Sequence, residues 1–221
     1  MITKMPFKLE AGLEKTGPSS SRSRPVAEPH WRSALPELSD EVVTLREVRR
    51  ADAPSLCAML STPEVRRYMS PPPTDIQGFE RFIEWTQAER RAGRHLCFAV
   101  VPKDCDVAIG IFQVRQVDTD FTIGEWGAAF GSEFWGTGLF EAAAELLFDF
   151  LFDELGMRRL EARAAVQNGR ANGAARKMGS APEGVIRQGL RCRGEYHDQL
   201  MWSLLAEDWR QLKIDERPMV H

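Results

Sequence analysis

The chain has 221 residues, 43% of them hydrophobic, and a formal net charge of −3. This length is enough for one domain with a full hydrophobic core, and the slight acidic excess excludes a global positive field for nucleic acid. No apolar run is long enough to cross a bilayer, and the N-terminus lacks the continuous apolar segment of a secretory signal. We therefore expect a cytoplasmic protein with no membrane partner and no nucleic-acid partner.

Residues 1–36 differ in composition from the rest of the chain. They contain the stretch GPSSSRSRP and six Lys or Arg residues against three Glu. Such a polar segment is typical of a flexible, solvated arm. The alternative is an arm that clamps a partner subunit or ribosomal RNA.

The first half of the folded part is predicted to alternate between strands and helices. Alternation of apolar residues predicts strands near 41–48, 95–101 and 106–117. Asp52 is the expected cap of a helix that ends near Leu60, and a second helix is expected over 75–92. Between the helices, Tyr68 and Met69 precede a stiff loop of three prolines.

The stretch 121–156 organises the chain. A strand to Phe130 is followed by a glycine-rich turn and then by an apolar helix that begins at Leu139 and ends at Gly156. Glu141, Glu145, Asp149 and Asp153 form one acidic stripe on this helix. A strand that ends in such a turn directs backbone N–H groups and the positive end of the helix dipole to one place, which predicts a phosphate site. The alternative is a tight turn without a ligand.

The remaining segments complete a mixed sheet. A strand is expected over 158–166, a helix over 168–178, strands over 184–191 and 196–205, and a C-terminal tail over 211–221. Paired helices, antiparallel strands and one βαβ unit indicate an α+β domain. The cysteines (Cys57, Cys97, Cys105 and Cys192) stand singly without CxxC spacing, so we expect ordinary thiols and no metal site.

Three motifs carry a resemblance to a known family. WGTGLFEAA at 135–143 resembles the acetyl-CoA pyrophosphate loop of the GNAT superfamily of N-acetyltransferases, and NGRANGAARKMGSAPEG at 168–184 is similar to that superfamily's Asn-x-x-Ser…Gly-Phe…Glu-Gly stretch. GEYHDQLMWSLL at 194–205 resembles the closing strand of the branch that acetylates N-termini of ribosomal proteins. The resemblance implies a GNAT domain over 37–210. Its sheet would have seven mostly antiparallel strands with one splayed parallel pair, flanked by about four helices.

The resemblance also implies a site. Acetyl-CoA would be the co-substrate, and an acceptor amine would pass over Tyr68 and Met69. The pyrophosphate and pantetheine contacts fall on Ala128, Ala129, Phe130, Trp135, Gly136, Thr137, Gly138, Leu139, Phe140 and Asn168. We expect Arg170, Arg176 and Lys177 to be solvated charges on a helix. The alternative is that they contact the adenosine 3′-phosphate of the cofactor.

Several residues depart from the family pattern. Phe140 stands where a small residue is usual, Ala171 replaces a Ser that can protonate the leaving thiolate, and Leu190 aligns with an acidic residue of some members. Ser180 also replaces the usual Phe. We therefore expect Glu125, the only charge in its row of the central strand, to act as the general base. The alternative is that Glu125 faces solvent or pairs with an arginine such as Arg115. For Asp198, a structural hydrogen bond is preferred over a catalytic pair with His197.

These observations predict an N-acetyltransferase that acts by direct attack in a ternary complex. The acceptor would be a primary amine, either a protein N-terminus or a polyamine- or antibiotic-like small molecule. The alternatives are a non-catalytic acyl-CoA sensor or assembly module of the same fold and, on weaker grounds, an RNA- or ribosome-docking module that uses the basic arm. A homodimer is compatible with the sequence.

Overall fold

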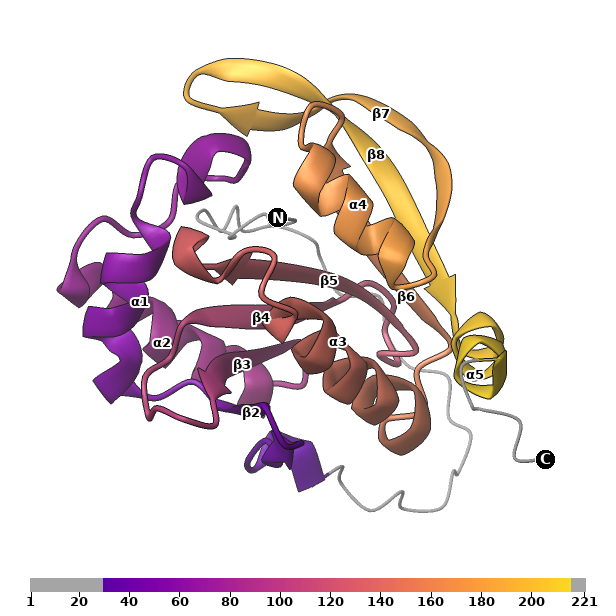
Figure 1. Ribbon diagram of the computed structural model, residues 1–221, viewed down its shortest axis with the longest axis horizontal. Helices are drawn as coiled ribbons and strands as arrows, with labels where there is room; N and C mark the ends of the chain where they lie inside the picture. Colours follow the sequence, from indigo (N-terminus) through magenta and orange to yellow (C-terminus); the bar gives the residue numbers. More distant parts are fainter. Residues whose placement is uncertain (1–29, 216–221) are drawn as a thin grey trace, which may run out of the picture.

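The computed structural model describes residues 30–215, which form one sheet in the order β1-β2-β3-β4-β5-β6-β8-β7 (Figure 1). The strands are β1 (Leu38–Ser39), β2 (Val43–Glu47), β3 (His95–Pro102), β4 (Gly110–Gln116), β5 (Ile123–Phe130), β6 (Arg159–Ala165), β7 (Ala181–Cys192) and β8 (Glu195–Leu205). Every neighbouring pair is antiparallel except β5 and β6. The predicted mixed sheet with one parallel pair is confirmed. The extra strand, β1, is too short to leave a periodic pattern in the sequence.

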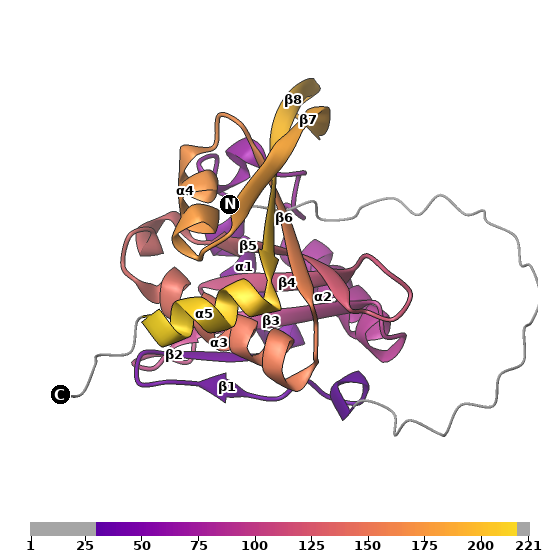
Figure 2. The ribbon, with the colours of Figure 1, turned by 90° about the vertical axis from the view of Figure 1, so that its right-hand side faces the viewer.

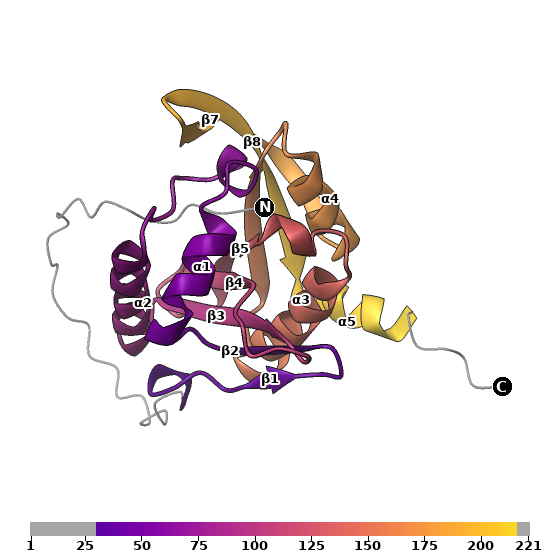
Figure 3. The same cartoon turned by 60° about the vertical axis from the view of Figure 1, so that its left-hand side comes forward.

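Helices cover both faces of this sheet. They are α1 (Ala53–Leu60), α2 (Ile76–Arg91), α3 (Leu139–Asp149), α4 (Gly169–Lys177) and α5 (Ala206–Asp215). Figure 3 separates the two layers, with α1 and α2 on one side of the sheet and α3 and α4 on the other, and Figure 2 shows α5 beside α3. Within 30–215, no helix is both long and apolar enough to span a membrane.

The parallel pair opens into a fork. β5 and β6 pair only from Ile123–Arg159 to Glu125–Glu161. Beyond that point β5 continues along β4 as far as Phe130, while β6 continues along β8 as far as Ala165. The facing edges of the two strands therefore diverge past Glu125, and their backbone groups there make no ladder with each other.

The central helix ends in an unexpected way. After Asp149 the chain makes one π-helical turn (Phe150–Glu154), and Gly156 then takes a φ of +70°. The acidic stripe is not merely solvated, because its carboxylates receive partners from α4 and α5. These pairs are Lys177–Glu141 at 2.6 Å, Lys213–Glu145 at 3.2 Å, Arg210–Asp153 at 3.1 Å and the Trp209 indole N–H to Asp149 at 2.8 Å.

Both predicted ends of the domain need correction. Residues 211–215 belong to α5, so the tail predicted from 211 is wrong over that stretch. At the other end, Trp31 and Leu35 are buried, and the Trp31 ring packs edge-on against Phe121 with centroids 5.4 Å apart. Residues 30–36 are therefore part of the folded body rather than of an arm, and residues 1–29 of the predicted arm lie outside the described residues.

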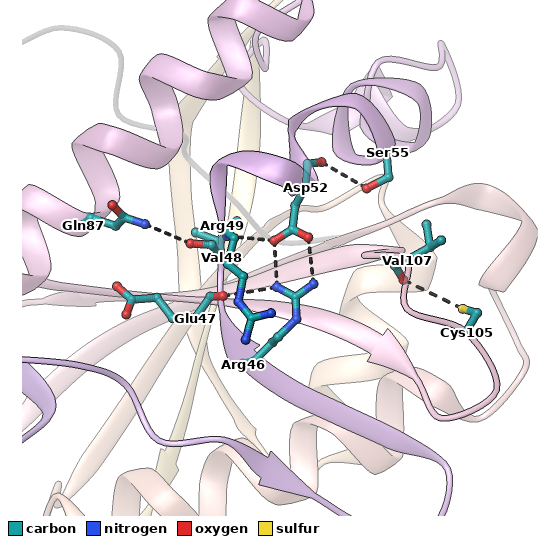
Figure 4. A network of polar contacts seen from close by, with 9 residues as sticks. All are labelled: Arg46, Glu47, Val48, Arg49, Asp52, Ser55, Gln87, Cys105 and Val107. Carbon is teal, nitrogen blue, oxygen red and sulfur yellow. Dashed lines mark hydrogen bonds and ion pairs between the residues drawn. The ribbon is translucent and has the colours of Figure 1, made fainter.

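Asp52 does not cap α1 through its side chain. Its carboxylate instead accepts two hydrogen bonds from the buried guanidinium of Arg46, at 2.7 and 2.8 Å, and one from the Arg49 backbone N–H (Figure 4). Nearby, the Gln87 amide donates to the Val48 carbonyl and attaches α2 to the end of β2. A buried carboxylate favours a guanidinium over a lone helix N–H because the charge must be compensated.

The β7–β8 hairpin contains an irregular stretch around Gln188, whose φ is +51°. The Gln188 N–H donates to the Asp198 carboxylate at 2.8 Å. The preferred structural role of Asp198 is thus confirmed.

Candidate functional site

A cavity of about 250 Å³ lies where β5, the start of α3 and one side of α4 meet. Its walls are mostly apolar, and its charged members stand on the helices. It is lined by Ala128, Phe130, Phe134, Trp135, Gly136, Phe140, Glu141, Arg170, Gly173, Ala174 and Lys177. Five of the predicted cofactor contacts are in this set, and they come from β5, the glycine turn and the start of α3.

The turn that opens α3 depends on two left-handed glycines. Gly136 has a φ of +76° and Gly138 a φ of +87°, and no heavy atom lies within 4 Å of the place where either would carry a Cβ. Gly138 is the N-cap of α3 and provides no side-chain cap, so the N–H groups of the first turn are left without intrahelical partners. Thr137 donates its hydroxyl to the Phe134 carbonyl, and Leu139 packs half-buried against the core. The turn can therefore receive an anion.

The fork presents one edge of β5 to this cavity. Ala128 and Phe130 line it, whereas Ala129 faces the α1–α2 layer and is fully buried, so Ala129 can contribute only main-chain atoms. The indole N–H of Trp135 donates to the Phe130 carbonyl at 3.2 Å. This bond attaches the turn to the end of the strand and occupies a main-chain acceptor that the family resemblance assigns to the cofactor.

Phe140 belongs to both the cavity and the core. It lines the cavity, and its ring lies 5.6 Å from Phe112, 5.8 Å from Phe130 and 6.4 Å from Trp126 between centroids. A small residue here would leave this aromatic cluster incomplete. The departure from the family pattern is thus accommodated by packing on β4 and β5.

One side of α4 lines the cavity, although the sequence indicates only Arg170 and Lys177 there, as an alternative to solvated charges, and does not indicate Gly173 and Ala174. Arg170, Gly173, Ala174 and Lys177 recur at helical spacing and all line the cavity, with two small residues between two cations. Arg170 does not simply extend into solvent, because its guanidinium carbon lies 4.2 Å from the Trp135 ring centroid. The spacing of small residues was the available signal, but it acquires meaning only when α4 is placed beside α3.

Two further cavities continue from the first. The second shares Trp135 and Arg170 with it and reaches Tyr68, Gln167 and Asn168. The third shares Tyr68 and Gln167 with the second and ends at the β7–β8 turn. Tyr68, which is predicted to contact the acceptor, therefore lines both of these cavities. Met69 does not, because its side chain is 0% exposed and packs in the α1–α2 core.

Asn168 and Ala171 stand at the start of α4. The buried Asn168 caps the helix by accepting from the Ala171 N–H at 3.2 Å, and Ala171 is completely buried. Leu190 is also buried, against Ala165 and Cys192. Ala171 and Leu190 therefore offer no side-chain group that can carry a proton.

Glu125 lies at the last paired position of the fork and is 9% exposed. Arg115 of β4 donates to its carboxylate, and the Arg163 Nε lies 3.7 Å away. The alternative interpretation, pairing with Arg115, is therefore the arrangement observed. The opposite residue on β6, Glu161, is equally buried and binds Arg159 at 3.0 Å. Within 30–215, no group of three or more His, Cys, Asp or Glu residues could hold a metal ion.

A model of the acetyltransferase (GNAT) domain matches residues 43–181, which is more than half of the chain. The chain belongs to the GNAT acetyltransferase family. A relative in sequence, the uncharacterized N-acetyltransferase p20 of Bacillus licheniformis, is 29% identical over 173 residues, 78% of this chain and 97% of p20. The match places the fork, the glycine turn and α4 of this chain within a GNAT acyltransferase.

Solved GNAT structures share the fold at low sequence identity. The ribosomal L7/L12 α-N-protein acetyltransferase RimL, solved with coenzyme A, superposes with a TM-score of 0.71 at 16% identity and covers 77% of this chain and 98% of RimL. The ribosomal-protein-S5-alanine acetyltransferase of Vibrio fischeri gives a TM-score of 0.70 at 18% identity, with 78% and 98% covered. Both similarities establish the architecture.

Proposed function

We propose that this protein transfers the acetyl group of acetyl-CoA to a primary amine in a ternary complex. The observation that carries the proposal is the position of the cavity. It begins at the left-handed glycine turn before α3, follows the open edge of β5 and continues to Tyr68. A long, narrow co-substrate and an acceptor can then meet inside the fork.

The residues of the chain fit the phosphate-bearing end of acetyl-CoA. Helix N-termini favour anions, and open space beside Gly136 and Gly138 lets the backbone approach one closely. Arg170 adds positive charge along the same wall, where Lys177 is already paired with Glu141 at 2.6 Å. Acetyl-CoA would supply the thioester that acylates the amine.

The chain must also accept a proton, because an amine is protonated near neutral pH and cannot attack in that form. We propose Glu125 for this role, since Ala171 and Leu190 provide no alternative. Its contacts with Arg115 and Arg163 would fix the carboxylate in one orientation. Positioning of the two substrates alone can contribute about 7–11 kcal/mol, so a family member that lacks one proton-transfer group can remain active.

The acceptor is a protein N-terminus or a small-molecule amine. Protein acceptors are named for RimL and for the Vibrio fischeri enzyme, which share this fold. We propose that the reaction takes place in the cytoplasm.

The test combines binding with turnover. Calorimetric titration with CoA measures occupancy of the cavity, and release of free thiol from acetyl-CoA against a panel of amines and N-terminal peptides measures transfer. Binding together with amine-dependent thiol release supports the proposal. Binding without turnover on any acceptor supports an acyl-CoA sensor instead, and absence of CoA binding contradicts both.

A further inference from the structure

The second and third cavities adjoin each other on the side of the site away from the glycine turn. They share Arg67, Tyr68 and Gln167, and the second cavity shares Trp135 and Arg170 with the first, which we propose to bind the cofactor. We call these two adjoining cavities the acceptor groove and define it by Arg67, Tyr68, Trp135, Gln167, Arg170 and Arg193.

The far end of the groove is rigidly attached. The thiol of the buried Cys192 lies 3.2 Å from the Met69 carbonyl oxygen, and Arg193 donates to the Pro63 carbonyl at 3.2 Å. These contacts join the β7–β8 turn to the segment 63–69. The two walls of the groove are therefore fixed before an acceptor arrives, which reduces the entropy lost on binding.

Three exposed arginines line this groove without a counter-ion. Within residues 30–215, Arg67, Arg170 and Arg193 make no ion pair with any carboxylate. Arg67 lies 5.1 Å from the Tyr68 ring centroid, and Arg170 lies over Trp135. Stacking holds both guanidinium planes while their N–H groups stay available for carboxylates.

The groove also contains negative and titratable groups. Glu64 lines the second cavity, while Glu195 and His197 line the third, with the His197 Nε2 4.0 Å from the Glu195 carboxylate. The Glu195 side chain is 80% accessible, so solvent screens its charge strongly. The three arginines outnumber the two carboxylates, and they do so in a chain whose net charge is −3.

We propose that the acceptor groove binds the acidic N-terminal segment of a polypeptide. This inference rests on the proposed acetyl transfer and selects among its acceptors. A polycationic amine would be repelled by Arg67, Arg170 and Arg193, which disfavours polyamine-like molecules. RNA is disfavoured as well, because one face of the Tyr68 ring and one face of the Trp135 ring are already covered by guanidinium groups instead of being free to stack bases.

The experiment uses three peptides that share a free N-terminal serine. Positions two to four are Glu in the first peptide, Gln in the second and Lys in the third. We expect kcat/KM to decrease in that order, with at least a tenfold advantage of the Glu peptide over the Gln peptide at low salt. The advantage should shrink at high salt because exposed charges are screened. Equal rates on the Glu and Gln peptides at low salt would overturn the proposal.

Charge variants of the groove sharpen the test. Arg67→Gln together with Arg193→Gln should bring the Glu:Gln ratio close to one, and Arg67→Glu with Arg193→Glu should shift the preference to the Lys peptide. Arg81→Gln, an exposed arginine on α2 outside the groove, is the matched control and should keep the ratio. A ratio that survives both groove substitutions contradicts the proposal.

A binding measurement separates this inference from the proposed function. Fluorescence anisotropy of labelled peptides with the CoA-bound protein does not require turnover. Tighter binding of the Glu peptide without acetylation would support the groove and contradict the transferase. Acetylation with no charge preference would support the transferase and contradict the groove proposal. If the arginine substitutions abolish binding of a single-stranded RNA probe and change no peptide parameter, the groove is a nucleic-acid site and the proposal is wrong.

Discussion

Arg170 lies over the ring of Trp135, with 4.2 Å between the guanidinium carbon and the ring centroid. The pair joins the first turn of α4 to the turn before α3, and both residues line the cavity proposed to bind the cofactor as well as the acceptor groove. It therefore forms the boundary between the two halves of the site. A cation–π contact of this kind is worth about 0.5–2 kcal/mol, which is enough to hold a wall but weak enough to let it move when a ligand binds.

The glycine turn yields the first prediction. Gly138→Ala should weaken CoA binding at least tenfold, because a Cβ would stand between the backbone and the bound phosphates. Gly156→Ala is a matched control. Gly156 also has a positive φ (+70°) and open space around it, but it lies at the far end of the central helix. Each substitution should cost about 1–2 kcal/mol of stability.

Calorimetry with CoA and urea unfolding distinguish the two glycine effects. Equal stability losses with a loss of affinity in Gly138→Ala alone would support the anion site. Unchanged CoA affinity in Gly138→Ala would remove the turn from the cofactor contacts.

Phe140 yields the second prediction. Truncation of a fully buried Phe to Ala costs about 3–5 kcal/mol of stability. Truncation of the half-buried Phe140 should therefore cost clearly less. Phe140→Ala should bind CoA at least as tightly as the parent, because removal of the ring widens the cavity. Phe148→Ala is the control, since Phe148 is fully buried in the same aromatic cluster but does not line the cavity. Loss of CoA binding by a folded Phe140→Ala protein would show that the ring supports the site.

The sequence predicts the β5–turn–α3 unit because local signals agree there. Strand alternation, glycines at left-handed positions and an apolar helix follow one another within one stretch. The C-terminal end of the domain was predicted wrongly because no local signal marks it. α5 is held by Trp209, Lys213 and Arg210, whose partners on the central helix are about sixty residues away along the chain, as between Asp149 and Trp209.

The candidate site was predictable only in part, on similar grounds. The glycine turn and the β5 edge lie close together in sequence, so the sequence predicts both, and residues of both line the cavity. The lining side of α4 depends on how α4 packs beside α3, which no local pattern specifies. Met69 was misassigned because an apolar residue next to a loop can face either the groove or the core, and the core buries more apolar surface. The partner of Glu125 depends on the register of β4 against β5, which places Arg115 directly opposite.

His95 yields a prediction about pH. The imidazole is 3% exposed, and burial lowers its pKa to about 4 from the ordinary 6.5. Between these two pH values the unfolded chain binds a proton at His95 that the folded chain does not. The contribution of the neutral His95 to the free energy of unfolding is therefore fully present above pH 6.5 and decreases as the pH falls toward 4. At about pH 5 the loss should be about 2 kcal/mol. Urea unfolding at pH 7.5 and pH 5 should show this loss in the parent and not in His95→Gln. An equal loss in both proteins would assign the effect to other groups.

The last prediction concerns the proton acceptor. Glu125 and Glu161 face each other across the last pair of the fork, have the same 9% exposure, and each bind an arginine. They differ in their strands, because Glu125 lies on β5, where Ala128 and Phe130 line the cavity proposed to bind acetyl-CoA, whereas no residue of β6 lines it. Glu125→Gln keeps the shape and removes the basicity, so kcat should fall roughly 10²-fold while acetyl-CoA affinity stays the same.

The pH profile decides between a chemical and a structural role. With Glu125 as the base, the acidic limb of kcat/KM should disappear in Glu125→Gln and persist in Glu161→Gln. Both substitutions remove one buried carboxylate from an arginine, so urea unfolding should report similar losses of stability, and stability alone cannot explain a difference in rate. If Glu125→Gln keeps its rate and its acidic limb, the pair with Arg115 is structural. The proton would then leave through water or a backbone carbonyl, because Ala171 and Leu190 cannot accept it.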